Sequence, residues 1–178
     1  SIFFDVDDKI DSYMSKENFY SLRYNKDMHE GNYKKKKFAE FYPDSLKAVY
    51  NNGKSYVTVP YVLDVLSAFY YVRSMDLFPG DTIVIDSHEN GKNYPLLVKV
   101  HSIEDLELDG KVYNTIKIEP RLRGEGVFRQ KGRVFIWLTN DKYKTPVFLK
   151  AKIVADVKGK GMSLGSVKAY ISKIKYKK

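Results

Sequence analysis

A serine flanked by glycines is the most recognisable catalytic pattern in this sequence. Gly161-Met162-Ser163-Leu164-Gly165 matches the G-x-S-x-G turn that exposes the nucleophile of serine hydrolases. In those enzymes a helix follows the serine, and the catalytic histidine lies downstream of it. Here an alternating, strand-like pattern follows, and His29, His88 and His101 all precede Ser163. We therefore interpret the segment as a flexible hairpin rich in glycine and lysine, and we predict no catalytic residue.

Patterns that bind metals or cofactors are equally weak. The histidines lack the i, i+4 spacing of a zinc pair, and the absence of cysteine excludes thiolate ligands, cysteine nucleophiles and disulfides. Asp5, Asp7 and Asp11 share one face of a predicted strand, but the glycine and ligand spacing of a calcium loop are missing. Gly124-Glu125-Gly126 lacks the third glycine of a dinucleotide loop. We predict no metal and no cofactor, and keep a site assembled from distant strands as an alternative.

Length and composition indicate one folded domain. The chain has 178 residues, of which 43% are hydrophobic and 30% charged, which is typical of a globular protein and not of a disordered one. We expect a single β-rich domain over residues 1–178. The longest apolar run, around Val65 to Val72, is far shorter than the roughly 20 residues that span a bilayer, so no transmembrane segment is predicted.

The chain is basic. Lys and Arg number 31 against 22 Asp and Glu, a net charge of +9, and many of the lysines lie in Lys34–Lys37 and in the C-terminal segment 173–178. Such a charge attracts acidic partners, including nucleic acid and anionic lipid. Lysine also protects the edges of sheets from pairing with other chains. We favour this second reading, which makes nucleic acid an unlikely partner, and keep a basic nucleic-acid-binding β module as the alternative.

Turn signals separate alternating apolar runs along most of the chain. Asn52-Gly53, Asn90-Gly91 and Asp109-Gly110 each favour the positive φ angles of two-residue hairpin turns. Strands follow one another with few helical patterns between them, which predicts an antiparallel meander. The first strand begins abruptly at Ile2, so we expect earlier strands in the full gene product. The strands are predicted over Phe3–Tyr13, Ser21–Asn25, Asn32–Tyr42, Ser45–Tyr50, Thr82–Asp86, 94–106, Lys111–Glu119, Arg133–Leu138, Val147–Val157 and Ser166–Ile174.

One helix is predicted, from Val62 to Ser74, after Pro60 and before Pro79. Its residues are apolar nearly all the way round, and such a helix must be buried on most sides. A sheet curled around it would bury it. The predicted fold is therefore mainly β: a curved antiparallel meander, either an open barrel or a clam-like half-barrel, wrapped on one buried apolar helix, with Trp137 in its lining.

The helix also carries most of the candidate ligand-binding residues. Arg73 needs a carboxylate or several carbonyls if it is buried, and Asp141, Glu119 and Asp81 are the candidate carboxylates. We expect Phe69 and Trp137 to lie in the core. At least one of the tyrosines beside Phe69 should form a hydrogen bond within the protein, because a buried phenol needs a polar partner. The candidate ligand-binding residues are Phe69, Tyr70, Tyr71, Arg73 and Trp137.

Several segments resemble a known bacterial family. They are Phe4–Tyr13, Asp64–Arg73, Leu77–Asp81, Gly91-Lys92, Ile116–Pro120, Gly126–Phe128, Ile136–Asp141 and Pro146-Val147. In order and spacing they resemble the exported proteins of the domain-of-unknown-function family 3108. The resemblance covers nearly the whole chain. It implies an exported protein of the Gram-negative envelope, periplasmic or associated with the outer membrane, which could be a lipoprotein, and it implies no known activity.

The sequence thus favours a non-enzymatic envelope protein. Its curved sheet would bind an apolar or amphipathic ligand, such as a lipid, or dock an envelope protein. A ligand site should lie at an open rim of the sheet, because the interior is expected to be mostly filled. Two alternatives stay open: the basic nucleic-acid-binding module, and a hydrolase whose site is assembled across strands.

Overall fold

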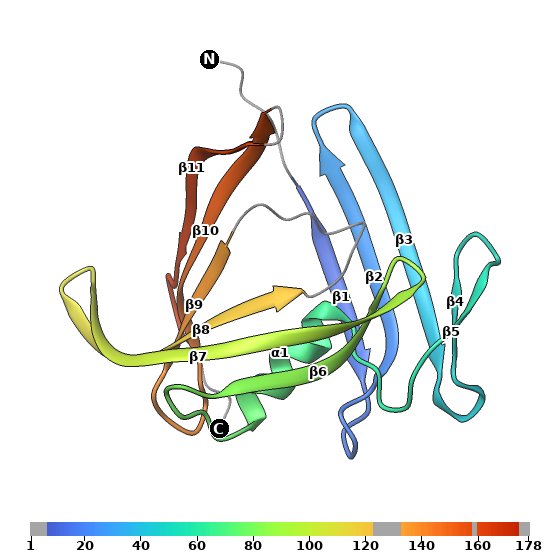
Figure 1. Ribbon diagram of the computed structural model, residues 1–178, viewed down its shortest axis with the longest axis horizontal. Helices are drawn as coiled ribbons and strands as arrows, with labels where there is room; N and C mark the ends of the chain where they lie inside the picture. The colour runs from blue at the N-terminus through green and yellow to red at the C-terminus, as the bar shows by residue number, and fades with distance from the viewer. Residues whose placement is uncertain (1–6, 123–132, 158–159, 175–178) are drawn as a thin grey trace. The chain divides into compact units, whose positions relative to one another are not determined.

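The computed structural model describes residues 7–122, 133–157 and 160–174 of the chain (Figure 1). Within these ranges it contains eleven strands, one α-helix, α1 (Val65–Ser74), and one short 3-10 helix, η1 (Pro43–Ser45). The strands form two antiparallel sheets in which neighbours in space are also neighbours in the chain. The predicted mainly β fold, an open antiparallel meander with one helix, is confirmed, with two sheets in place of a single one.

The two sheets contain five and six strands. The order in the first is β1 (Lys9–Met14), β2 (Ser21–Glu30), β3 (Tyr33–Tyr42), β4 (Lys47–Tyr50) and β5 (Ser55–Val57). The order in the second is β11 (Lys160–Tyr170), β10 (Pro146–Val157), β9 (Arg133–Thr139), β8 (Lys111–Leu122), β7 (Lys92–Leu108) and β6 (Thr82–Glu89). The chain divides into two compact units. The first comprises Ser1–Val72 with Ile85–Pro95, and the second comprises Arg73–Val84 with Leu96–Lys178.

Two of the three predicted hairpin turns have the expected geometry. Asn90 and Gly91 have φ angles of 53° and 77°, and Asp109 and Gly110 have 50° and 73°, as a two-residue type I′ turn requires. The third differs. Residues 51–54 separate β4 from β5, so that loop has four residues, and of its asparagine-glycine pair only Gly53 has a positive φ. Asn-Gly marks the turn correctly but does not fix its length.

Gly91 should be far less tolerant of alanine than Gly110. The two glycines occupy equivalent turn positions, so alanine meets the same unfavourable φ at both, at a cost of about 1 kcal/mol each. A Cβ at Gly91 would lie 2.6 Å from the Tyr56 ring, whereas nothing lies within 4 Å of one at Gly110. We expect Gly91→Ala to destabilise by about 1–2 kcal/mol more than Gly110→Ala in urea unfolding. Equal losses would show that the Tyr56 ring moves aside freely.

The helix begins later and is less buried than predicted. Val62 and Leu63 are extended: Leu63 forms a parallel bridge with Ser87, and α1 starts only at Val65. Its buried residues are Ser67, Ala68 and Val72, while Val65 and Tyr70 are largely exposed. Small side chains form the buried stripe of the helix, and several large ones reach solvent. The apolar composition of the helix did not predict which of its faces is buried.

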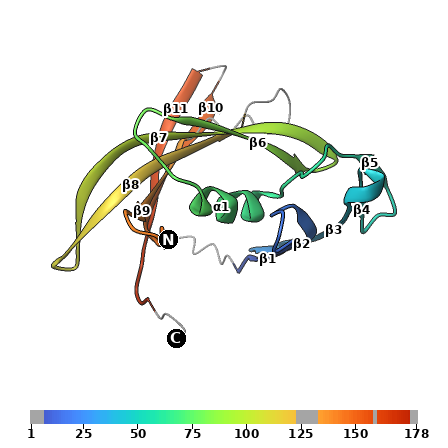
Figure 2. The same ribbon diagram turned by 90° about the horizontal axis from the view of Figure 1, so that it is seen from below.

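The second unit has a sheet with one uniformly apolar face. Val98, Val100, Ile116, Ile118, Ile136 and Leu138 are all buried and alternate along β7, β8 and β9 with residues of the opposite face. The paired strands β7 and β8 bend together towards their tip (Figure 2). On the opposite face of the sheet, Leu106, Leu108 and Tyr113 near the tip pack with Phe135 and Trp137. Trp137 is 6% exposed, which confirms its predicted place in the core.

Candidate functional site

The three aromatic candidates on α1 lie closer to the surface than predicted. Phe69 is half-buried and is not part of the core, which corrects that expectation; its ring centroid lies 5.9 Å from that of Tyr70. Tyr70 is 50% exposed. Tyr71 is half-buried, with its ring tilted against that of Phe19 at 5.8 Å. The argument that a buried phenol needs a polar partner therefore does not apply to Tyr70, and the hydrogen bond expected of Tyr70 or Tyr71 stays a prediction.

Arg73 is held by backbone carbonyls. Its Nε donates to the carbonyl oxygen of Lys144 at 2.8 Å, and its Nη2 donates to that of Tyr143 at 3.0 Å. The same loop is folded by Asp141, whose Oδ1 accepts from the backbone N–H of Tyr143 and of Lys144. Asp141, one of the candidate partners of Arg73, shapes the loop that supplies the two carbonyls. These contacts give Arg73 a structural role at the end of α1.

Trp137 is covered by the protein's own side chains. Its Nε1 donates to Glu104 Oε1 at 2.6 Å. The Lys117 ammonium lies 4.9 Å from its ring centroid, and the Phe148 ring lies 4.8 Å away, itself stacked on Tyr170. The indole ring is thus packed within the protein and does not offer an exposed face to a ligand.

The chemical patterns singled out in the sequence do not converge on a catalytic or metal site. Ser163 lies within β11 opposite Val154, so no strand-to-helix turn exposes it. Among the residues that the structure describes, no group of three or more His, Asp or Glu side chains could hold a metal ion. Lys9 pairs with Asp11 at 3.4 Å, as expected for exposed charges. Asp5 and Gly124–Gly126 lie outside the described residues.

Each histidine has a separate environment. His29 contacts Asp27 at 3.1 Å, and His101 contacts Glu119 at 2.7 Å. His88 is buried, with its Nδ1 2.6 Å from Asn93 Oδ1. Burial lowers the pKa of His88, although the hydrogen bond with Asn93 acts in the opposite direction. The histidines therefore do not form a shared acid–base or ligand site.

A buried aspartate fixes the start of α1 to the first sheet. Asp64 Oδ1 accepts from the backbone N–H of Leu66 and Ser67, which caps the helix. Its Oδ2 accepts from the hydroxyls of Ser12 at 2.7 Å, Ser21 at 2.6 Å and Ser67 at 3.0 Å. No partner was predicted for Asp64 from the sequence. The serines of β1 and β2 were missed because they are over 40 residues away.

An open groove runs beside this cluster, between β1 and α1. Its volume is about 460 Å³, within the range of binding pockets. It is lined by the five consecutive residues 10–14 of β1 and by Leu66 and Tyr70 of the helix. Ile10 and Tyr70 are exposed apolar side chains in this groove. Of the candidates from the sequence, Tyr70 is the one that lines it.

Among the strands that the structure describes, β1 beside the groove pairs with β2 alone and so is an edge strand of the first sheet. The Asp7 N–H donates to the His29 carbonyl at 2.8 Å, and the register continues with Lys9 opposite Asp27. Hydrogen-bonded pairs alternate along an antiparallel ladder, so Lys9, Asp11 and Tyr13 use their backbone groups to bind β2. Those of Ile10 and Ser12 point to the open edge. The groove is therefore bordered by backbone donors and acceptors that can pair with another strand.

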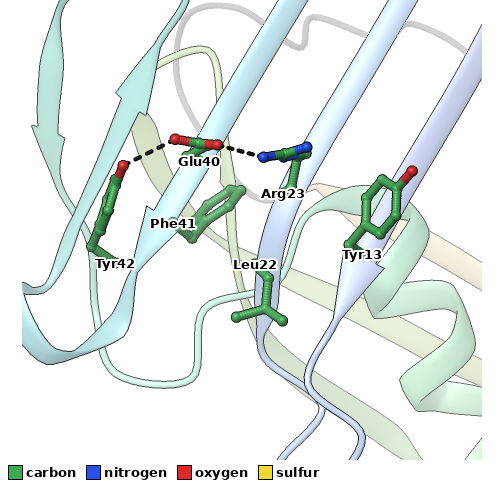
Figure 3. Close-up of a pocket in the computed structure, with 6 residues that line it drawn as sticks. All are labelled: Tyr13, Leu22, Arg23, Glu40, Phe41 and Tyr42. Carbon is green, nitrogen blue, oxygen red and sulfur yellow. Dashed lines mark hydrogen bonds and ion pairs between the residues drawn. The ribbon is translucent and has the colours of Figure 1, made fainter.

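A second hollow of about 370 Å³ lies next to β1 across β2 and β3 (Figure 3). Arg23 Nη2 donates to Glu40 Oε1 at 2.7 Å, and the Tyr42 hydroxyl donates to Glu40 Oε2 at 2.9 Å. The Arg23 guanidinium also lies 5.9 Å from the Tyr13 ring centroid. The hydrogen bonds from Arg23 and Tyr42 lower the pKa of Glu40, so it is a fixed carboxylate and not a general acid. Tyr13 lines both hollows.

The second unit holds a different cluster, around the completely buried Glu119 of β8. Arg133 binds it through two nitrogens, Nε to Oε1 at 2.6 Å and Nη2 to Oε2 at 2.9 Å. Arg121 Nη2 donates to Oε2 at 2.9 Å, and His101 Nε2 lies 2.7 Å from the same oxygen. Burial alone would raise the pKa of Glu119, but the hydrogen bonds from Arg133, Arg121 and His101 outweigh it and hold the pKa well below its usual range.

Comparison with known proteins identifies the family and no activity. A family model described as "Protein of unknown function (DUF3108)" matches residues 1–160. Neither the search of curated proteins nor that of solved structures gave a match. In the part of the chain that the structure describes, α1 is too short to cross a membrane, and no other helix is long and apolar enough to do so. Because the model matches most of the 178 residues, the chain belongs to the DUF3108 family of proteins of unknown function.

Proposed function

We propose that this protein is a non-enzymatic binding protein whose edge strand β1 accepts an extended segment of a partner protein as an added strand. The observation that carries the proposal is that no strand within the described residues pairs with the outer edge of β1, where the backbone groups of Ile10 and Ser12 point next to the groove against α1. An added strand gains affinity from main-chain hydrogen bonds and specificity from pockets for alternate side chains. An envelope location, which the family resemblance implies, is part of the same proposal.

The two hollows would supply the specificity. Side chains of an added strand point alternately to the two faces of the sheet. Those on one face would meet Leu66 and Tyr70 in the groove, which favours apolar residues. Those on the other would meet Tyr13 and, beyond it, the Arg23–Glu40 pair, which favours polar or aromatic residues. The preferred partner segment therefore alternates between apolar and polar residues.

An extended polypeptide suits this groove better than a lipid. Sites for small apolar ligands usually enclose most of the ligand surface. Here the groove is open and follows five residues of one strand, and its polar backbone groups have no partner in an acyl chain. The apolar contacts available to a lipid would be limited to Ile10, Met14, Leu66 and the tyrosine rings.

Proline at position 10 should abolish strand addition. Ile10→Pro removes an outward N–H and leaves the donors that bind β2 in place. We expect 12-residue peptides, selected from a random library against the wild-type protein, to bind this variant at least about tenfold more weakly. Fluorescence anisotropy with labelled peptides measures the affinity.

The matched control is Val57→Pro. Val57 lies on β5, the opposite edge of the same sheet, and should not affect binding. Both variants must first show wild-type circular dichroism. Unchanged peptide affinity in Ile10→Pro, or an equal loss in both variants, would refute strand addition at β1. Failure to select any peptide, with a fluorescent fatty acid bound by the wild type and lost in Leu66→Glu, would identify a lipid groove instead.

A further inference from the structure

The Glu119 cluster is buried at its centre and exposed at its rim. Glu119 is fully buried, whereas the side chains of Arg121 and Arg133 are 43% and 49% exposed. A guanidinium carries five N–H donors. Glu119 takes two of those of Arg133 and one of those of Arg121. Both arginines therefore keep N–H groups that a ligand can reach, while the carboxylate fixes their orientation.

The charge around the cluster favours a doubly negative ligand. Lys152 of β10 lies directly opposite Arg133 in the ladder, so its exposed side chain is on the same face of the sheet. Two guanidiniums and one ammonium against one carboxylate leave two positive charges. A phosphate monoester is close to a dianion at neutral pH and offers several acceptor oxygens. Arginine forks match these oxygens in geometry as well as in charge.

We propose that Arg121 and Arg133, oriented by the buried carboxylate of Glu119, form a binding site for a phosphate monoester. Lys152 adds charge at the edge of this site. Glu119 is a positioning residue, because it has no exposed surface through which to touch the ligand. The ligand is either a free phosphate compound or a lipid headgroup with a terminal phosphate. The site belongs to the second unit and does not depend on strand addition at β1.

The same face is poorly suited to single-stranded nucleic acid. Proteins that bind single strands stack bases on exposed aromatic rings. Phe135 and Trp137 are 9% and 6% exposed, and Lys117 lies over both rings. The exposed side chains of Arg121, Arg133 and Lys152 instead present N–H donors suited to phosphate oxygens.

The experiment measures phosphate binding by the wild type, by an arginine variant of the site and by a control variant. Inorganic phosphate is titrated into the full chain at low ionic strength, and NMR shifts or calorimetry give the affinity. Arg121→Gln should weaken binding by about tenfold or more, because it removes charge-assisted hydrogen bonds while the two bonds from Arg133 still satisfy Glu119. Lys36→Gln is the control. It removes an exposed cation that is also paired with a carboxylate, that of Asp27, but in the first unit.

A second arm separates the two sources of phosphate. If the ligand is a lipid headgroup, vesicles of phosphatidylcholine with phosphatidic acid should retain the wild type better than Arg121→Gln. Binding of free phosphate without retention by these vesicles indicates a soluble ligand. Equal effects of Arg121→Gln and Lys36→Gln would reduce the site to general charge and overturn the proposal. So would absence of binding in both arms. An oligonucleotide that binds more tightly than either probe, and depends on Arg121, would favour nucleic acid instead.

Discussion

Replacing Asp64 with alanine should lower the free energy of unfolding by about 4 kcal/mol. The change removes a helix cap, which contributes about 1–2 kcal/mol, and leaves the hydroxyls of Ser12, Ser21 and Ser67 without their common acceptor. Hydrogen bonds to a charged group contribute about 1.5–3 kcal/mol each, and part of this is recovered because Ser12 and Ser67 lie 2.6 Å apart and can bind each other. Urea unfolding followed by circular dichroism measures the loss.

Two further variants define the cause. Asp64→Asn keeps the acceptor that caps the helix and replaces Oδ2 with an amide donor, so it should cost about half as much. Asp86→Ala changes an exposed aspartate of the same unit and should stay within about 0.5 kcal/mol of the wild type. A similar small loss in Asp64→Ala would mean that the serines find other partners and that the cluster does not hold α1 to β1 and β2.

Replacing Glu119 with glutamine should cost about 2–3 kcal/mol and weaken the proposed phosphate site. The variant keeps the size of the side chain but removes the charge that both arginines face, and it buries an amide among three donors. Glu107→Gln, at an exposed position of β7, is the control for loss of one negative charge. If Glu119→Gln unfolded at the wild-type urea concentration, the buried carboxylate would not organise the cluster.

The same substitution should make the free energy of unfolding depend less on pH in the acid range. Because the pKa of Glu119 is lower in the folded than in the unfolded chain, its stabilisation is complete above the ordinary glutamate pKa of 4.5 and is lost as the pH falls below it. We expect the wild type to lose more stability than Glu119→Gln from about pH 5 to about pH 3. Asp27 and Glu40 also have lowered pKa values, but they are present in both proteins. Parallel curves would contradict the assignment.

Local sequence signals determined the class of fold. Alternation of apolar and polar residues along segments such as Lys111–Glu119 predicted strands, because side chains of a strand point to opposite faces in turn. The turns at Asn90-Gly91 and Asp109-Gly110 were predicted for the same kind of reason: few residues other than Gly, Asn and Asp adopt positive φ easily. The meander followed, since short connections pair consecutive strands. Trp137 was placed in the core from its position in an apolar run.

The helix illustrates where this local information ends. Its nearly continuous apolar residues predicted burial on most sides, yet the buried stripe consists of Ser67, Ala68 and Val72. The type of a residue indicates whether its side chain can be buried at a low cost in free energy. It does not show that the side chain is buried, because the surface of a folded protein still contains many apolar atoms. Which face is covered depends on what packs against it. Phe69 was therefore placed in the core although it is half-buried.

The clusters around the two buried carboxylates, Asp64 and Glu119, depend on residues that only the folded chain brings together. The Asp64 cluster joins serines from three segments. Glu119 meets Arg133 only because β9 pairs with β8, and it meets His101 at a break in the register of β7. None of these groups has a characteristic spacing, since register between strands sets their distances and many sequences produce the same register. The sequence alone determined strands, turns and charge. The tertiary structure decided which charges are buried, which backbone edge is open, and therefore where a partner or a phosphate could bind.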